Sequence, residues 1–245
     1  IKFQLIQMPE TRVLASGVVE RIGIENGSIS YKTETADFSE KVDFKDHAEG
    51  LQKVANLLMS AEIGVIKNAA EVDAVGHRVV HGGKQFTKTI KVNDEVKANI
   101  KRLFSLAPLH NPANLTGIEV AEKLFEDTPQ VCVFDTAFFE SVPQKAYQYA
   151  IPQHLMEESR IRAYGFHGTS HKYVSKKALN HLDDPYAKII TIHLGNGCSM
   201  TAGGGEQMTL VKFIGWPPPL LDCYSMKPGT LPNLLRLPRN LNGNA

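Results

Sequence analysis

The stretch Val131-Cys132-Val133-Phe134-Asp135-Thr136 indicates the fold class. Its four apolar residues form a short uninterrupted run, which is typical of a strand buried on both faces of a sheet. Apolar residues at helical spacing on either side, over 114–125 and 170–182, predict helices that cover such a sheet. Because strands and helices alternate along the chain, the sequence predicts an α/β protein.

Further elements follow from the same patterns. Helices are predicted over 46–59, with Asp46 as N-cap, and over 93–106, with Asn93 as N-cap. The predicted strands are 1–6, 13–24, 28–33, 74–80 and 188–194. From Gly203 on, Gly203-Gly204-Gly205 and Trp216-Pro217-Pro218-Pro219 predict a poorly structured tail, since proline removes backbone donors.

Composition narrows the class of protein. The chain has 245 residues, a formal charge of +1 and 42% hydrophobic residues, as expected for a soluble globular protein. The balanced charge argues against nucleic-acid and membrane partners, and no apolar run approaches the ~20 residues that span a bilayer. Three widely spaced cysteines (Cys132, Cys198 and Cys223) predict neither disulfides nor zinc. We therefore expect a cytoplasmic protein, with Cys132 as a buried small hydrophobe.

Gly76-His77-Arg78-Val79-Val80-His81-Gly82-Gly83 carries an arginine within an apolar strand. A guanidinium there needs an anionic partner, because burying an unpaired charge is costly. The partner is either a bound carboxylate or phosphate, or an aspartate in a structural ion pair, and the spacing leaves both open. In Leu109-His110-Asn111-Pro112, we expect His110 to brace a turn, with a ligand contact as the alternative.

Three more segments place polar residues where strands meet turns. Asp135 ends the buried strand and needs a cation, a metal or several donors, although an aspartate can also simply cap a helix or form a turn. In Gly165-Phe166-His167-Gly168-Thr169-Ser170-His171, free amides at a helix start predict an anion site beside His167. His167 and His171 also have zinc-pair spacing, but no H-E-x-x-H motif follows. Gly195-Asn196-Gly197 suits either a phosphate loop or a hairpin turn.

Together, and in this order, these segments resemble the acetokinase (acetate kinase) family. The resemblance runs from Ile1 to about Ala202, and Gly76–Gly83 is its most specific motif. It implies the sugar kinase/Hsp70/actin-like (ribonuclease H-like) fold, with two α/β domains. It also implies reversible phosphoryl transfer from ATP to acetate, giving acetyl phosphate and ADP, with Mg²⁺ as cofactor.

The resemblance also implies residue roles. Asp135 and His167 match catalytic residues, and Arg78 matches the arginine that holds the substrate's carboxyl or phosphate group. Val80, Leu109 and Phe166 match the apolar pocket for the acetate methyl group. The matching ATP-binding residues are Lys2, His193, Leu194, Gly195, Asn196 and Gly197. No metal ligand is assigned with certainty, although Asp135 is expected near the metal.

The sequence also departs from the family pattern. A Gly-Ser-rich loop is expected before Ile1, and segment 203–245 has no expected counterpart. The resulting domain prediction is a substrate-side domain over 1–185, the start of a nucleotide-binding domain over 186–202, and the tail over 203–245. We expect this chain to be truncated and inactive alone, and the full-length enzyme to be a homodimer. The alternatives are a propionate or other short-chain carboxylate kinase, a non-catalytic fragment and, distantly, a zinc module.

Overall fold

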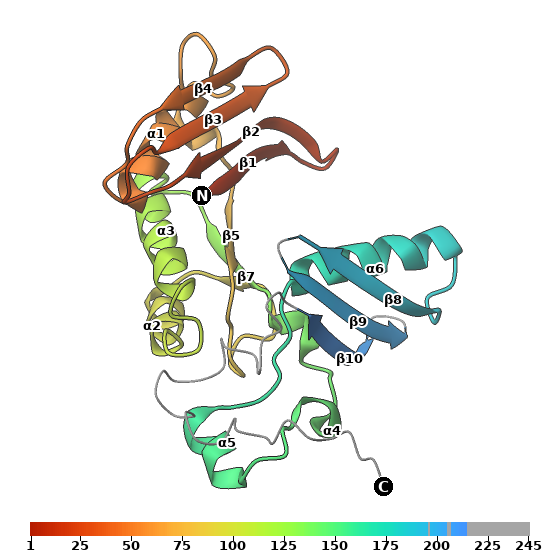
Figure 1. Ribbon diagram of the computed structural model, residues 1–245. Helices are drawn as coiled ribbons and strands as arrows, with labels where there is room; N and C mark the ends of the chain where they lie inside the picture. The colour runs from red at the N-terminus through yellow and green to blue at the C-terminus, as the bar shows by residue number, and fades with distance from the viewer. Residues whose placement is uncertain (196, 205–206, 215–245) are drawn as a thin grey trace, which may run out of the picture. The chain divides into compact units, whose positions relative to one another are not determined.

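The computed structural model describes residues 1–195, 197–204 and 207–214 (Figure 1). The chain divides into two compact units. Unit 1 comprises Ile1–His77, Lys91–Lys97 and Pro112–Cys132, and unit 2 comprises Arg78–Ile90, Ala98–Asn111 and the chain from Val133 on. No helix in the described ranges has the length and apolar character needed to cross a membrane. The predicted domains over 1–185 and 186–202 are continuous stretches, unlike these units, and that assignment stays a prediction.

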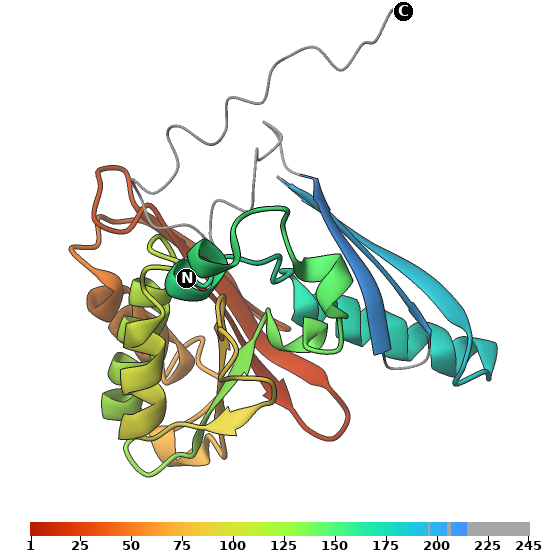
Figure 2. The ribbon, with the colours of Figure 1, turned by 90° about the horizontal axis from the view of Figure 1, so that it is seen from below.

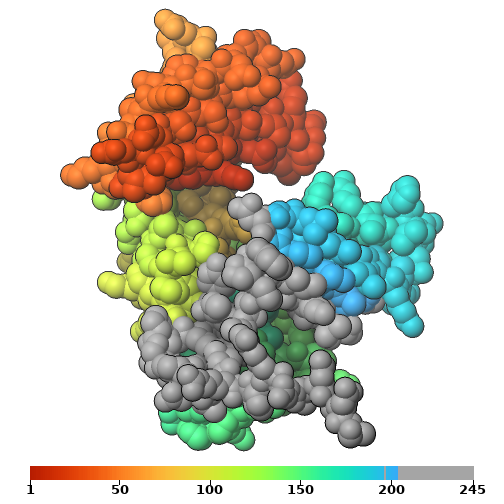
Figure 3. Space-filling view, viewed as in Figure 1, coloured from red at the N-terminus to blue at the C-terminus, as the bar shows by residue number. Residues whose placement is uncertain are grey.

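Unit 1 is built on a four-stranded antiparallel sheet in the order β1-β2-β3-β4. Its strands are β1 (Lys2–Gln7), β2 (Arg12–Glu20), β3 (Ser28–Thr33) and β4 (Asp37–Lys41). The strand predicted over 13–24 ends at Glu20, because Arg21 and Gly23 take left-handed φ values of 55° and 80° and turn the chain. The residues from β1 through α1 (His47–Leu58) make one closely packed body, coloured red to orange in Figure 3.

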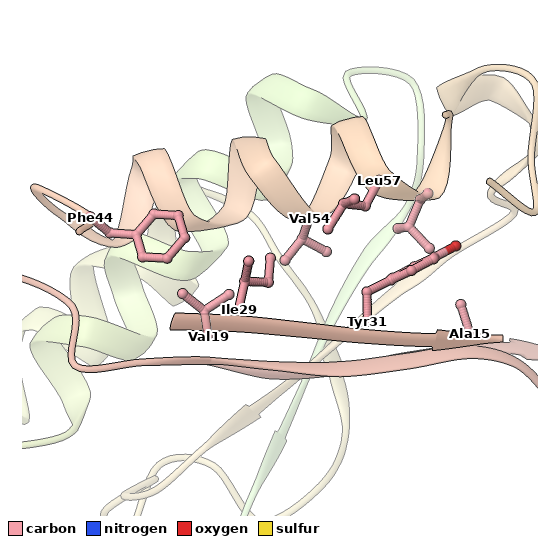
Figure 4. Packing of buried hydrophobic residues seen from close by; sticks show 8 residues of the cluster. Ala15, Val19, Ile29, Tyr31, Phe44, Val54 and Leu57 are labelled. Atoms are coloured by element: carbon pink, nitrogen blue, oxygen red, sulfur yellow. The ribbon is translucent and has the colours of Figure 1, made fainter. Parts of the chain in front are cut away.

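The core of unit 1 lies between this sheet and α1. Side chains from alternate strand positions face the helix, as Figure 4 shows for Val19, Ile29 and Tyr31. The N-cap prediction for α1 is confirmed, because the side chain of Asp46 accepts a bond of 3.0 Å from the amide of Glu49. Glu49 in turn accepts from the amide of Lys45 at 2.6 Å, so two free donors at the helix start are satisfied.

A second sheet has the order β5-β7-β6, with β5 at Val75–Val79, β7 at Gln130–Phe134 and β6 at Ile90–Lys91. The amide of Val75 bonds the carbonyl of Pro129 at 2.9 Å, and the amide of Asp135 bonds the carbonyl of Val79 at 3.0 Å. These bonds show that β5 and β7 run in the same direction, so their carboxyl ends lie next to each other. Such ends are where α/β sheets bind ligands.

Unit 2 carries a three-stranded antiparallel sheet in the order β10-β9-β8, with helix α6 along one face (Figure 2). The elements are α6 (Gly168–Leu182), β8 (Lys188–Leu194), β9 (Cys198–Gly204) and β10 (Gln207–Ile214). Strand alternation turns Thr191 and His193 toward α6, while Ile190 and Ile192 stay exposed. The other helical elements are η1 (Ala69–Glu71), α2 (Asp94–Arg102), α3 (Asn111–Leu124), η2 (Ala137–Phe139), α4 (Gln144–Tyr147) and α5 (Gln153–Ser159).

The tail prediction needs correction where the structure describes it. Strand β9 runs on to Gly204 and β10 occupies Gln207–Ile214, so 203–204 and 207–214 are not structureless. The physical reason is that this stretch is rich in apolar residues and contains no proline, since the prolines of the tail begin at Pro217. Positions 205–206 and 215–245 lie outside the described residues.

Candidate functional site

Arg78 and Asp135 form an ion pair at the adjacent ends of β5 and β7. Arg78 Nη2 lies 2.6 Å from Asp135 Oδ2, and Nε lies 3.0 and 3.1 Å from the two carboxylate oxygens. The Asp135 side chain is 1% exposed and that of Arg78 is 58% exposed. The guanidinium raises no burial problem, because much of it stays in contact with solvent. Of the two partners considered for Arg78, the structure therefore shows the aspartate of an ion pair. The exposed part of the guanidinium remains accessible to an anion.

Asp135 also holds the start of α6. The hydroxyl of Thr169 donates to Asp135 Oδ1 at 3.1 Å, and the amide of Gly168 donates to the Asp135 carbonyl at 3.1 Å. A Cβ on Gly168 would collide with that carbonyl, so the close approach requires glycine. The prediction that the Gly-Thr-Ser run opens a helix is confirmed, since α6 begins at Gly168. The positive end of the helix dipole therefore lies beside the ion pair.

His167 occupies the N-cap position of α6 with a left-handed φ of 60°. Its Nδ1 lies 2.9 Å from Ser199 Oγ, and its ring stacks on that of His193 with centroids 4.2 Å apart. Burial is the main cause that lowers the pKa of His167, and the neighbouring His193 lowers it further. Asp135 opposes this shift and Arg78 adds to it, so the ion pair and the imidazole act on one another electrostatically.

A buried polar network lies behind His167. His171 Nδ1 is 2.7 Å from Thr191 Oγ1, and His171 Nε2 is 2.9 Å from Ser199 Oγ. Burial lowers the pKa of His171 to about 4, so the ring is neutral at pH 7. Both of its nitrogens are used by hydroxyls, and none of the described residues form a group of three or more side chains that could hold a metal. Both ring nitrogens of His171 are thus engaged within the protein.

A second polar frame fixes the turn after β5. The amide of His81 donates to Asn111 Oδ1 at 3.1 Å, and Asn111 Nδ2 donates back to the His81 carbonyl at 2.9 Å. The amide of Gly82 donates to the hydroxyl of Thr136 at 3.0 Å. All of these groups are buried, so their backbone donors need such partners. The frame holds the chain that follows Arg78 against the chain that follows Asp135.

The residues predicted to line a methyl pocket lie in different environments. Val80 is half-buried, Phe166 is buried against the ring of His81, and Leu109 is 78% exposed. Burial is the main cause that lowers the pKa of His110. The charge of Arg78 lowers this pKa further, and the charge of Asp135 raises it. His110, which the sequence left as a turn brace, therefore belongs to the surroundings of the ion pair.

The predicted phosphate loop is the turn between β8 and β9. Leu194 and Gly195 are exposed there, and the amide of Gly195 bonds the carbonyl of Gly197 at 2.9 Å. Asn196, a predicted ATP contact, lies outside the described residues. Lys2, the remaining predicted ATP contact, is exposed on β1 in unit 1.

Of the site predicted from the sequence, the structure brings together Arg78, Asp135, His167 and His193. Thr169, His171, Thr191 and Ser199 complete the arrangement, and none of them was among the predicted site residues. Thr169 and His171 lie within the conspicuous 165–171 motif, whereas no pattern marks a lone Ser199 in a strand. A half-exposed guanidinium, an imidazole and a helix amino terminus form a site suited to a small anion.

Comparison with known proteins finds relatives that match most of this chain. An acetate kinase of Flavobacterium johnsoniae is 56% identical over 202 residues, which is 82% of this chain and 51% of that protein. The crystal structure of Porphyromonas gingivalis acetate kinase has a TM-score of 0.82 at 39% identity, covering 86% of this chain and 54% of that one. A propionate kinase from Francisella tularensis subsp. tularensis SCHU S4 has a TM-score of 0.80 at 37% identity, with the same coverage.

The chain spans about half the length of the curated relatives it matches. An alignment with an acetate kinase of Symbiobacterium thermophilum, 44% identical, covers 96% of this chain and 61% of that protein. The acetokinase family model matches residues 1–209, so the family pattern runs past Ala202, where the sequence motifs end. The two structures, at 39% and 37% identity, share the fold predicted from the motifs. On this evidence, the chain belongs to the acetokinase family.

Proposed function

We propose that the site around Arg78 binds a short carboxylate and its acyl phosphate in the reaction of an acetate kinase. That reaction transfers the γ-phosphoryl group of ATP reversibly to acetate, giving acetyl phosphate and ADP. The observation that carries the proposal is the assembly of Arg78, Asp135 and His167 at the start of α6. The names of the relatives support the same reaction, because those compared are acetate or propionate kinases.

The chemistry of the reaction explains the residue types. Acetate is already ionised at neutral pH, so the difficulty is bringing two anions together rather than removing a proton. The exposed part of the Arg78 guanidinium holds the carboxylate, and the buried carboxylate of Asp135 keeps that guanidinium in place. His167 and the amides at the start of α6 stabilise the phosphoryl oxygens, whose charge is spread in the transition state. In this proposal, alignment and charge neutralisation supply the catalysis.

A divalent metal, Mg²⁺ in this proposal, supplies charge neutralisation at the ATP phosphates when bound. Mg²⁺ keeps several waters and commonly binds one or two carboxylates together with substrate phosphates. The described residues form no group of three or more ligating side chains, and the carboxylate of this site, Asp135, already accepts from Arg78 and Thr169. This donor set fits a metal that arrives with the nucleotide, not one held in a protein cage.

Substrate length is set, in this proposal, by the apolar residues Val80, Leu109 and Phe166. A methylene in an apolar pocket is worth about 1–3 kcal/mol, so an enclosed wall discriminates only modestly. Leu109 is 78% exposed, so its side chain does not enclose a substrate methyl group by itself. That exposure, together with the similarity to a propionate kinase, makes propionate the second candidate substrate. The ATP contacts are proposed at Lys2 and at the His193–Gly197 turn.

The test measures binding of acetyl phosphate to the purified 245-residue chain by isothermal titration calorimetry. We expect saturable binding with one site, and at least a tenfold loss of affinity in Arg78→Ala, since a charge-assisted bidentate contact is worth ~1.5–3 kcal/mol. Arg102→Ala is the matched control, because it removes an exposed guanidinium whose partner is Asn99. Unchanged affinity in Arg78→Ala, or no binding by the unmodified chain, would contradict the proposal.

A further inference from the structure

His167 is connected to the interior of unit 2 by three buried side chains. Ser199 is 0% exposed, His171 1% and Thr191 5%. The contacts run in a line from Thr191 Oγ1 to His171 Nδ1 at 2.7 Å, from His171 Nε2 to Ser199 Oγ at 2.9 Å, and from Ser199 Oγ to His167 Nδ1 at 2.9 Å. Two strands and a helix contribute to this line, since Thr191 lies on β8, Ser199 on β9 and His171 on α6.

The hydrogens available to the line are few. Each hydroxyl carries one hydrogen, and a neutral imidazole carries one N–H on either nitrogen. Two arrangements satisfy the three contacts with Ser199 donating along the line. A third, in which His171 Nε2 and His167 Nδ1 both donate to Ser199, leaves the hydrogen of the 0% exposed Ser199 hydroxyl without an acceptor among these groups and is unfavourable. In the first, every group donates toward His167: Thr191 to His171 Nδ1, His171 Nε2 to Ser199, and Ser199 to His167 Nδ1. In the second, every group donates in the opposite direction, from His167 Nδ1 through Ser199 and His171 to Thr191.

Thr191 distinguishes these arrangements. In the first, its hydroxyl hydrogen is used by His171 Nδ1. In the second, Thr191 accepts from His171, and its own buried hydrogen needs another acceptor. No such acceptor for Thr191 occurs among the residues whose side chains are described, 1–195 and 197–203. Leaving a buried donor without an acceptor is unfavourable, so the first arrangement is preferred.

We propose that the line Thr191–His171–Ser199 fixes the proton of neutral His167 on Nε2, which makes His171 and Ser199 positioning residues. Because Ser199 donates to Nδ1, the neutral ring must carry its hydrogen on the other nitrogen. His167 then presents an N–H donor, which suits an anionic phosphoryl group, in place of a lone pair, which would repel it. This use of the donor rests on the proposed function, whereas the proton position rests on the hydrogen bonds alone.

The other groups that act on His167 are compatible with this assignment. Its ring stacks on His193, whose Nδ1 is engaged with the hydroxyl of Ser170 at 3.0 Å. The carboxylate of Asp135 favours a hydrogen on the ring and the guanidinium of Arg78 disfavours it. Since Arg78 and Asp135 pair with each other, their effects on the His167 ring oppose one another.

The experiment reads the histidine tautomers of the 245-residue chain by long-range ¹H–¹⁵N NMR at pH 7.5, with His167 assigned through His167→Gln. We expect His167 and His171 both to carry their proton on Nε2. In Ser199→Ala the ¹⁵N shift of His167 Nδ1 changes and its Nδ1–H tautomer becomes detectable, while Ser199→Thr retains the pattern of the unmodified chain. Ser175→Ala is the matched control, because it removes a buried hydroxyl of α6 that has no hydrogen-bond partner among the described residues.

An Nδ1–H tautomer of His167 in the unmodified chain overturns the inference, and this reading stands even if Ser199→Ala fails to fold. Unchanged His167 shifts in a folded Ser199→Ala variant also overturn it. Acetyl phosphate is then added to the same samples. An Nε2–H tautomer without acetyl phosphate binding refutes the proposed function and leaves the proton position intact. Binding with the Nδ1–H tautomer refutes only the inference about Ser199 and His171.

Discussion

Removing Arg78 should destabilise the protein more than removing the charge of its partner. In Arg78→Ala, the Asp135 carboxylate stays 1% exposed and loses three contacts of 2.6–3.1 Å. Among the described residues, Thr169 alone would still donate to it. Breaking a buried pair in this way costs about 3–5 kcal/mol. Because Arg78 itself is 58% exposed, water reaches the pair and the lower end, about 3 kcal/mol, is expected.

The assay is urea unfolding followed by circular dichroism at pH 7, with Arg102→Ala as the control for loss of a surface guanidinium. Asp135→Asn should cost less, about 1–2 kcal/mol, since the freed guanidinium returns to water. The double variant Arg78→Ala/Asp135→Asn should be more stable than Arg78→Ala alone, because it no longer buries an unpaired charge. A cost below ~1 kcal/mol for Arg78→Ala, or a double variant less stable than it, would refute the reasoning.

Three other variants probe the scaffold by the same unfolding assay. Asp46→Ala should cost about 1 kcal/mol of stability, because it removes the side-chain acceptor for the Glu49 amide at the start of α1. Asp37→Ala, which removes one partner of an exposed ion pair, should change stability by no more than ~0.5 kcal/mol. Ile29→Ala should cost about 2–5 kcal/mol of stability, since Ile29 is 1% exposed, whereas Ile24→Ala, at an exposed position, should leave stability nearly unchanged. Equal losses of stability in the two variants would contradict the packing shown in Figure 4. Burial lowers the pKa of His81 from its ordinary value of 6.5 to about 3. Between these two pH values, His81 therefore binds a proton in the unfolded chain but not in the folded one. Stability contributed by neutral His81 is therefore complete above pH 6.5 and is lost as the pH falls, at about 1.4 kcal/mol per pH unit. His81→Asn keeps an acceptor for the Gly83 amide, and its free energy of unfolding should change less with pH. If that pH dependence is unchanged between pH 6.5 and 4, His81 is not its source.

Long periodic segments were predictable from sequence. Strands β3 and β8 match their predicted ranges, and α1 begins at its predicted cap, because alternation and capping are local properties. Strand β4 was not predicted, since Phe38 is the sole apolar residue of its five-residue span and its place is set by pairing with β3. The helix predicted over 93–106 ends at Arg102, where three-residue turns replace helical bonds at Leu103 and Leu106.

The site divides in the same way between local and long-range features. Arg78, Asp135 and His167 were predictable because each is a polar residue at a strand end or helix start, in an otherwise apolar or glycine-rich stretch. Ser199 and Thr191 were not, because a hydroxyl in a strand becomes distinctive only once β9 pairs with β8 and both pack on α6. The choice between an ion pair and a ligand for Arg78 likewise depended on the position of Asp135, which lies 57 residues further along the chain.

Mapping acetyl phosphate onto the chain by NMR tests the central claim, that these residues form one anion site. We predict that the Arg78 Nε–H, the amides of Gly168 and Thr169 and the His167 ring respond together, with one dissociation constant. The alternative location is the cavity of about 220 Å³ lined by Lys84, Arg160 and Arg162 among others, which also gathers positive charge. Shifts confined to that cavity, or different dissociation constants at Arg78 and His167, would contradict the account.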